Sequence, residues 1–182
     1  IWNALKLVKL WEGKQSDPDS YRDKSQNPIA IGSEVNFAVE WFEHRLNEAR
    51  TEVDKLFQDF RLSEALKTIY SLIWDDFCSW YLEWVKPGFD QPIDEKVYQK
   101  TVYFFEQLMQ LLHPFMPFIT EEIFQQLKKQ DKDLTVSLFE PAGQADQQLI
   151  TAGALLKEVI TAIRDARNKA QLKPKDTIQL HI

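Results

Sequence analysis

The chain has 182 residues, of which 44% are hydrophobic and 13% aromatic, a composition that excludes an intrinsically disordered protein. No run of about 18 apolar residues occurs, which excludes a membrane-spanning helix. The single cysteine, Cys78, excludes an internal disulfide framework and is typical of a reducing compartment, so we expect a cytoplasmic protein. The net charge of −6 opposes strong binding of nucleic acid by the chain as a whole.

Three helices are predicted in the first half of the chain. Residues 1–12 place apolar side chains on one helical face, and residues 12–33 then change to a polar composition that predicts a long loop. We expect Ser33 to cap a second helix of roughly 25 residues. Ser63 begins a third helix, which ends at residues 86–88 because the residue before a proline avoids helical geometry.

A fourth helix is predicted from Asp94 to Leu112, and a fifth helix ends near Lys129. Between them lie two prolines, three residues apart, which cannot both occupy the interior of one regular helix. We therefore expect a corner, and its apolar side chains are predicted to be the buried pivot of a helical bundle. These side chains are Phe115, Met116 and Phe118.

The C-terminal part of the chain has a different pattern. Residues 135–141 predict an extended segment, residues 146–172 have helical spacing, and residues 177–182 alternate as a strand does. We therefore predict an all-α fold: a bundle of about five helices over residues 1–133, followed by a small, truncated α+β appendage over residues 134–182. The chain begins with Ile1, and we expect it to be a piece of a longer protein.

Three segments carry a family resemblance. The sequence LLHPFMPFITEE at residues 111–122, the sequence IWDDFCSWYLE at residues 73–83 and Trp2-Asn3-Ala4 resemble the anticodon-binding helical domain of class I aminoacyl-tRNA synthetases. The valyl-tRNA synthetases fit best. One departure is Ser79, which stands where the family usually has aspartate.

The resemblance implies a function for the chain and for a longer parent enzyme. The domain would bind the anticodon stem-loop of tRNA(Val) and would contact the catalytic domain of the same polypeptide. The parent enzyme would attach valine to tRNA(Val) using ATP with Mg. Two alternatives remain: the same domain of an isoleucyl- or leucyl-tRNA synthetase, and a helical protein-interaction module that never contacts RNA.

Candidate RNA-binding residues are chosen by charge and position. Arg164 and Arg167 are three residues apart and share a helical face, and Lys173 follows in the same basic region. A guanidinium group binds phosphate well, so this region is a candidate phosphate contact, with a solvated surface as the alternative. Arg45 and Arg61 are further candidates on the long helices of the bundle.

Other chemistry-bearing residues are given structural roles. We expect His113 to form a hydrogen bond at the proline corner, and the tryptophans at 74, 80 and 84 to be buried rather than to stack on bases. The histidines and the cysteine lack metal-ligand spacing, and neither an ATP-activating motif nor a glycine-rich phosphate loop occurs. We therefore expect no catalytic residues, no metal and no cofactor in this chain.

Overall fold

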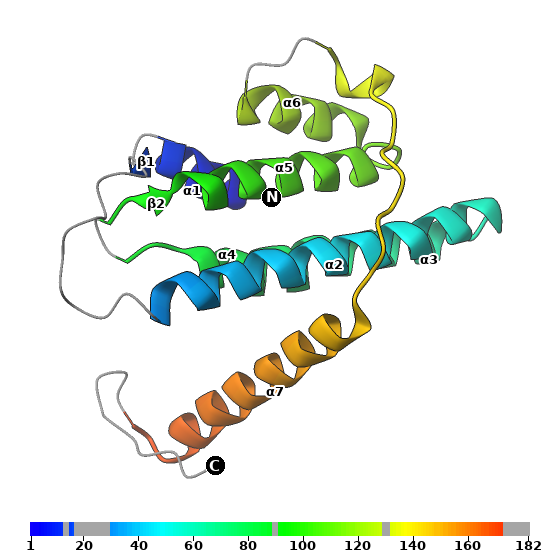
Figure 1. Cartoon of the computed structure of the whole chain (residues 1–182). Coiled ribbons are helices and arrows are strands. Elements are labelled where there is room, and N and C mark those ends of the chain that lie inside the picture. The colour runs from blue at the N-terminus through cyan, green and yellow to red at the C-terminus, as the bar shows by residue number, and fades with distance from the viewer. Residues whose placement is uncertain (13–14, 17–29, 89–90, 129–131, 173–182) are drawn as a thin grey trace.

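The computed structural model describes residues 1–12, 15–16, 30–88, 91–128 and 132–172. In this part of the chain the fold is all-α, as predicted, and its helices lie roughly side by side (Figure 1). The helices are α1 (Trp2–Glu12), α2 (Ala30–Gln58), α3 (Leu62–Ser71), α4 (Leu82–Val85), α5 (Glu95–Leu112), α6 (Pro117–Leu127) and α7 (Gln147–Lys169).

Helices α3 and α4 are joined by a π-helical segment, η1 (Leu72–Tyr81), so the three form one continuous helical rod. A 3-10 turn, η2 (Leu134–Val136), follows α6. Strands β1 (Gln15–Ser16) and β2 (Ile93–Asp94) form a parallel pair of two residues each. Among the described residues, no helix is both long and apolar enough to cross a membrane.

The bundle core is built from aromatic side chains that meet between α2, η1 and α5. Phe42 lies 5.3 Å from Phe77, 5.0 Å from Tyr81 and 5.1 Å from Phe104, measured between ring centroids. The hydroxyl of Tyr81 is 2.7 Å from the hydroxyl of Thr101, which satisfies both buried groups. Burial raises the pKa of Tyr81 because the charged phenolate loses its hydration.

The proline corner is present, but the prediction that it is a buried pivot is wrong. Phe118 is 91% exposed and Met116 is 46% exposed, and only Phe115 packs partly against the bundle, 5.8 Å from Phe57. Pro117 begins α6, so Phe118 falls on the outer face of the first turn. The buried residue of this turn is Thr120.

The hydroxyl of Thr120 donates to the carbonyl oxygen of Met116 at 2.8 Å and lies 2.8 Å from Nδ1 of His113. His113 therefore has the hydrogen-bonded structural role that was expected. Ser33 is not a helix cap, because α2 begins three residues earlier, at Ala30. Most of the predicted loop at 12–33 lies outside the described residues.

Helix α7 forms a further layer beneath α2 and the rod of α3, η1 and α4 (Figure 1). The predicted helix at 146–172 is thus confirmed. Part of the predicted extended segment is instead the turn η2. No α+β appendage is present among the described residues, and the strand predicted at 177–182 lies outside them.

Candidate nucleic-acid interface

Helix α7 carries the densest group of candidate cations, so its attachment to the bundle decides where they point. The attachment begins at Gly153, the buried residue of this helix. A Cβ atom on Gly153 would lie 2.1 Å from Nε1 of Trp41 in α2. Only glycine therefore allows the backbone of α7 to approach the indole ring this closely.

Farther along the same face of α7, two cations lie over aromatic rings of the bundle. Nζ of Lys157 is 4.6 Å from the ring centroid of Trp41, and Cζ of Arg164 is 5.4 Å from that of Trp80 in η1. A cation over an indole face is attracted by the negative charge of the π system. The face of α7 that meets the bundle thus combines Gly153 and these two cations with Leu149, which packs partly buried against the core.

Part of the apolar surface of α7 lies outside this contact. Leu155, Leu156 and Val159 are exposed, whereas Leu149 is partly buried against the core. The reason is that Gly153 and Lys157 occupy the face that docks, and the helix can bury only one side against α2.

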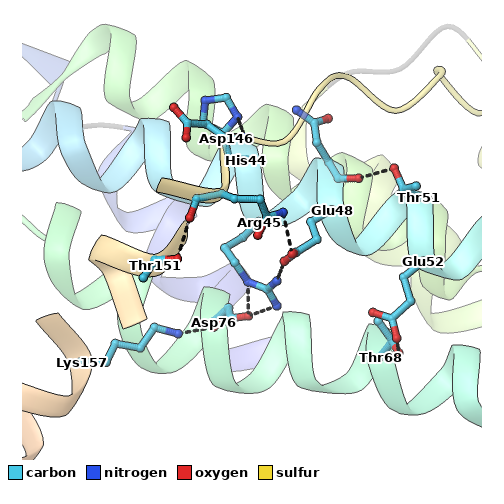
Figure 2. A network of polar contacts seen from close by, with 12 residues as sticks. His44, Arg45, Glu48, Thr51, Glu52, Thr68, Asp76, Asp146, Thr151 and Lys157 are labelled. Carbon is cyan, nitrogen blue, oxygen red and sulfur yellow. Dashed lines mark hydrogen bonds and ion pairs between the residues drawn. The ribbon is translucent and has the colours of Figure 1, made fainter. Parts of the chain in front are cut away.

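Asp76 joins α7 to α2 through two cations (Figure 2). Its carboxylate accepts hydrogen bonds from Arg45 of α2, at 3.2 Å from Nε and 2.9 Å from Nη2. The other carboxylate oxygen pairs with Nζ of Lys157 of α7. The side chain of Asp76 is only 7% exposed, so a buried negative charge is neutralised from two helices at once.

Arg45 is held by a second carboxylate, that of Glu48, one helical turn along α2. Burial opposes the charged form of Arg45, but attraction and hydrogen bonding to Asp76 and Glu48 outweigh it, and the pKa of Arg45 is raised. Arg45 was predicted as an RNA contact. In the structure its hydrogen bonds go to Asp76 and Glu48, and its contact with RNA stays a prediction.

The linker between η2 and α7 runs across the bundle (Figure 1), and hydrogen bonds attach it at several points. The amide of Gln110 donates to the carbonyl oxygen of Leu138 at 2.7 Å, and the hydroxyl of Tyr103 donates to the carboxylate of Glu140 at the same distance. The backbone N–H of Gly143 donates to the side-chain oxygen of Asn47 at 3.1 Å.

The linker ends at a helix cap. The carboxylate of Asp146 accepts from the first N–H groups of α7, at 2.8 Å from Gln148 and 3.3 Å from Leu149. The backbone N–H of Asp146 itself donates to Nδ1 of His44 at 3.2 Å (Figure 2). The direction of α7 is thus set from its first residue.

The remaining candidates lie at different ends of the bundle. Arg61, in the turn between α2 and α3, is exposed and donates to Glu64 at 2.7 Å, and this hydrogen bond raises the pKa of Arg61. Arg164 lies over the ring of Trp80. That ring contacts Trp84, which in turn contacts Trp41 in the first half of α2, so Arg164 is near that half of the helix. From Trp41 to Arg61 the chain rises by roughly 30 Å, at about 1.5 Å per helical residue.

The structure therefore groups Arg164 and Arg167 on α7 and separates them from Arg61. Arg164 is exposed on the surface of α7, and Arg167 follows one turn later, partly buried. Lys173 lies outside the described residues. Among the residues that the structure describes, no group of three or more His, Cys, Asp and Glu side chains is placed to hold a metal ion.

Sequence reasoning missed two groups that position this face. Gly153 lies inside a helical pattern, where glycine is less favourable than alanine by about 1 kcal/mol, and this cost was the signal that the position has a packing role. The burial of Asp76 was harder to predict from the sequence. Asp75 and Asp76 are adjacent and chemically identical, and only the fold shows that Asp76 is buried and Asp75 is exposed. Trp74 was expected to be buried and is 52% exposed.

Comparison with known proteins assigns a family to this arrangement. A sequence profile described as "Anticodon-binding domain of tRNA ligase" matches residues 39–182. The chain is 43% identical to the valine--tRNA ligase of Porphyromonas gingivalis over 182 residues, covering 99% of this chain and 19% of that protein.

Two further relatives agree. The chain is 41% identical to the valine--tRNA ligase of Parabacteroides distasonis over 184 residues, covering all of this chain and 20% of that protein. It is 34% identical to that of Listeria monocytogenes over 192 residues, covering 97% of this chain and 21% of that protein. The chain thus spans about a fifth of the length of the curated relatives that it matches.

Proposed function

We propose, because this chain belongs to the family of anticodon-binding domains of tRNA ligases, that it binds the anticodon stem-loop of tRNA(Val) as part of a valine--tRNA ligase. The observation that carries the proposal is the alignment of the whole chain with valine--tRNA ligases of several bacteria. It favours the valine enzyme over the isoleucyl and leucyl alternatives.

In this mechanism the domain positions the anticodon arm of the tRNA and carries out no chemical step itself. Unpaired anticodon bases can be recognised by their edges and faces, while cations hold the phosphate backbone. We assign the phosphate contacts to Arg164, Arg167 and Lys173, which follow one another along and after α7. Arg61 is a more distant candidate at the other end of α2. Arg45 acts through Asp76, by holding α7 in place rather than by touching RNA.

The division of the chain follows the same reasoning. Residues 1–133 are assigned to the helical bundle that receives the anticodon arm, and residues 134–182 to a C-terminal appendage whose described part consists of the turn η2, the linker and α7. The exposed leucine and valine side chains of α7 support this division, because an apolar helix face gains stability when an added layer covers it.

The parent enzyme would attach valine to tRNA(Val) using ATP with Mg, in the cytoplasm. That chemistry belongs to a catalytic domain of the same polypeptide outside this chain. The role of the present domain is to fix the anticodon arm, so that the acceptor end of the tRNA reaches the catalytic domain.

The proposal is tested by filter binding of the full-length ligase to tRNA(Val) and to a tRNA for another amino acid. Tighter binding of tRNA(Val), lost when the present domain is deleted, would support it. Equal binding of the two tRNAs, with or without this domain, would leave the protein-interaction module as the better description.

A further inference from the structure

A row of three tryptophan rings leads from the core of the bundle to its surface and ends beneath Arg164. Trp41 is fully buried, and its ring centroid lies 4.9 Å from that of Trp84. Trp84 lies 5.6 Å from Trp80, and both of these rings are partly buried. Cζ of Arg164 lies 5.4 Å from the ring centroid of Trp80. An exposed guanidinium group therefore rests on rings that the packed core holds in place.

The hydrogen-bond donors of Arg164 are not used by the fold. Arg45, Arg50 and Arg61 each donate to an oxygen atom of this chain, which fixes where their guanidinium groups point. Arg164 makes no hydrogen bond or ion pair with any residue that the structure describes. Its contact with the ring of Trp80 thus orients the guanidinium group, while the N–H groups at its edge stay open to a ligand.

We propose that Arg164, held by Trp80, is a stacking platform for an unpaired nucleobase of the bound RNA. A guanidinium group is planar and delocalised and stacks on flat π systems, and every nucleobase has such a face. The base lies on the side of the guanidinium group that is turned away from Trp80, and the N–H edge binds a neighbouring phosphate. The inference rests on the proposed function and deepens it, because it assigns Arg164 a base as well as a phosphate.

Stacking of this kind selects an unpaired base and not a sequence. A platform accepts all four bases, whereas a paired base inside a duplex is already stacked on both sides. Arg164 therefore distinguishes the loop of the anticodon arm from its stem. Reading of the anticodon sequence is left to residues that form hydrogen bonds with base edges.

The surroundings of Arg164 suit a nucleotide. Arg167 and Lys169 lie in the last turn of α7, so the phosphates beside the stacked base have further cations near them. Lys157 is the contrasting case on the same helix. It lies over the buried ring of Trp41 and pairs with Asp76, so its charge is used within the fold.

The experiment is a set of titrations of the full-length ligase with short RNAs. Arg164→Lys keeps the positive charge but removes the plane on which a base stacks. It should weaken binding of the anticodon stem-loop of tRNA(Val) by roughly tenfold, as for the loss of one stacked base. The slope of log affinity against log salt should stay unchanged, because the number of cations is the same.

A series of stem-loops, each lacking the base of one loop nucleotide, locates the stacked base. For one of these abasic RNAs the wild-type ligase and Arg164→Lys should bind equally, because no base is left to stack. For the others the roughly tenfold difference should persist.

A second variant removes the support instead of the platform. Trp80→Leu should reproduce the pattern of Arg164→Lys, and Trp80→Phe, which keeps a flat ring, should restore most of the affinity. Trp74→Leu is the matched control, because Trp74 is an exposed tryptophan of the same segment η1 and should leave binding unchanged. Arg164 is exposed, so Arg164→Lys keeps the proposal testable even if Trp80→Leu unfolds the domain.

Two outcomes would overturn the platform and leave the proposed function standing, provided that the wild-type ligase prefers tRNA(Val). Unchanged affinity of Arg164→Lys for the intact stem-loop would show that Arg164 acts only as a charge near phosphate. Equal weakening for the intact RNA and for every abasic RNA would show that no base stacks on it. Conversely, a wild-type ligase without preference for tRNA(Val), but with the predicted effect of Arg164→Lys, would overturn the proposed function alone.

Discussion

Gly153 of α7 lies so close to Trp41 of α2 that a single methyl group on it would fall 2.1 Å from the indole Nε1. The ring of Trp41 is fully buried and cannot move aside cheaply. The same ring also makes a cation–π contact with Lys157, one turn along α7. One tryptophan thus fixes both the distance and the register of the helix that carries the candidate RNA contacts.

The first prediction concerns this contact. Replacing glycine with alanine inside a helix normally stabilises it by about 1 kcal/mol. Gly153→Ala should do the opposite, because the added carbon overlaps Trp41 and displaces α7. Urea denaturation should show a lower free energy of unfolding, and proteolysis of the linker at 137–146 should be faster. A stabilised Gly153→Ala variant would show that α7 does not pack on Trp41.

The second prediction concerns the buried carboxylate. Asp76→Asn leaves Arg45 and Lys157 without their shared counter-charge, so it should destabilise the chain. We expect roughly 2–3 kcal/mol, below the 3–5 kcal/mol of a fully buried pair, because the two cationic side chains remain 25% and 22% exposed. The measurement is urea denaturation.

Asp75→Asn is the matched control for that variant. Asp75 is the neighbouring residue, is exposed and accepts a hydrogen bond from Ser71 at 2.7 Å. Its replacement should change the free energy of unfolding by about 0.5 kcal/mol or less, as at most surface sites. Equal losses for the two variants would mean that Asp76 does not join α7 to the bundle.

The third prediction separates the corner from the core. Phe118→Ala should change the free energy of unfolding of this chain by less than about 0.5 kcal/mol, because the side chain is almost wholly exposed. Phe105→Ala should cost about 3–5 kcal/mol, because that ring is buried and lies 5.3 Å from Phe77. A large loss for Phe118→Ala would restore the corner as a buried pivot.

The fourth prediction concerns the single cysteine. Burial raises the pKa of the Cys78 thiol, so less thiolate is present at a given pH than in an unfolded chain. Iodoacetamide reacts with the thiolate, so alkylation at pH 8 should be slower in the folded protein than in urea and should accelerate as the pH rises. Equal rates in the folded and unfolded protein would contradict this.

Helical spacing was enough to predict the main elements of the bundle and much of its core. Phe77, Phe105 and Leu108 belong to runs of apolar residues at three- and four-residue steps, and all three are buried. These helices are long, so the pattern repeats often enough to define one face. The exposed corner was missed because α6 begins at Pro117, and one turn is too short for periodicity to assign Phe118 to a face.

The docking of α7 was predictable only in part. Its helix and its cations follow from the sequence, but its exposed apolar stripe does not, because periodicity shows that a face exists and not what covers it. Arg45 looked like a free cation because its partner Asp76 is 31 residues away in the chain. Contacts of this kind depend on the fold, so sequence distance hides them.

The candidate phosphate contacts lead to a fifth prediction. Arg164→Ala combined with Arg167→Ala should weaken binding of all tRNAs alike and reduce the slope of log affinity against log salt by about one per cation lost. Arg61→Ala, roughly 30 Å of helix away from Trp41, is the matched control and should have the smaller effect. Equal effects of the two variants would place the phosphate backbone elsewhere on the bundle.

The central claim is that this domain reads an anticodon. The direct measurement is a titration of the full-length ligase with the anticodon stem-loop of tRNA(Val) and with the same stem-loop changed at its middle base. We predict clearly weaker binding of the changed RNA, by about tenfold or more, since a lost base contact costs about 1–3 kcal/mol. Indistinguishable affinities for the two RNAs would contradict the account.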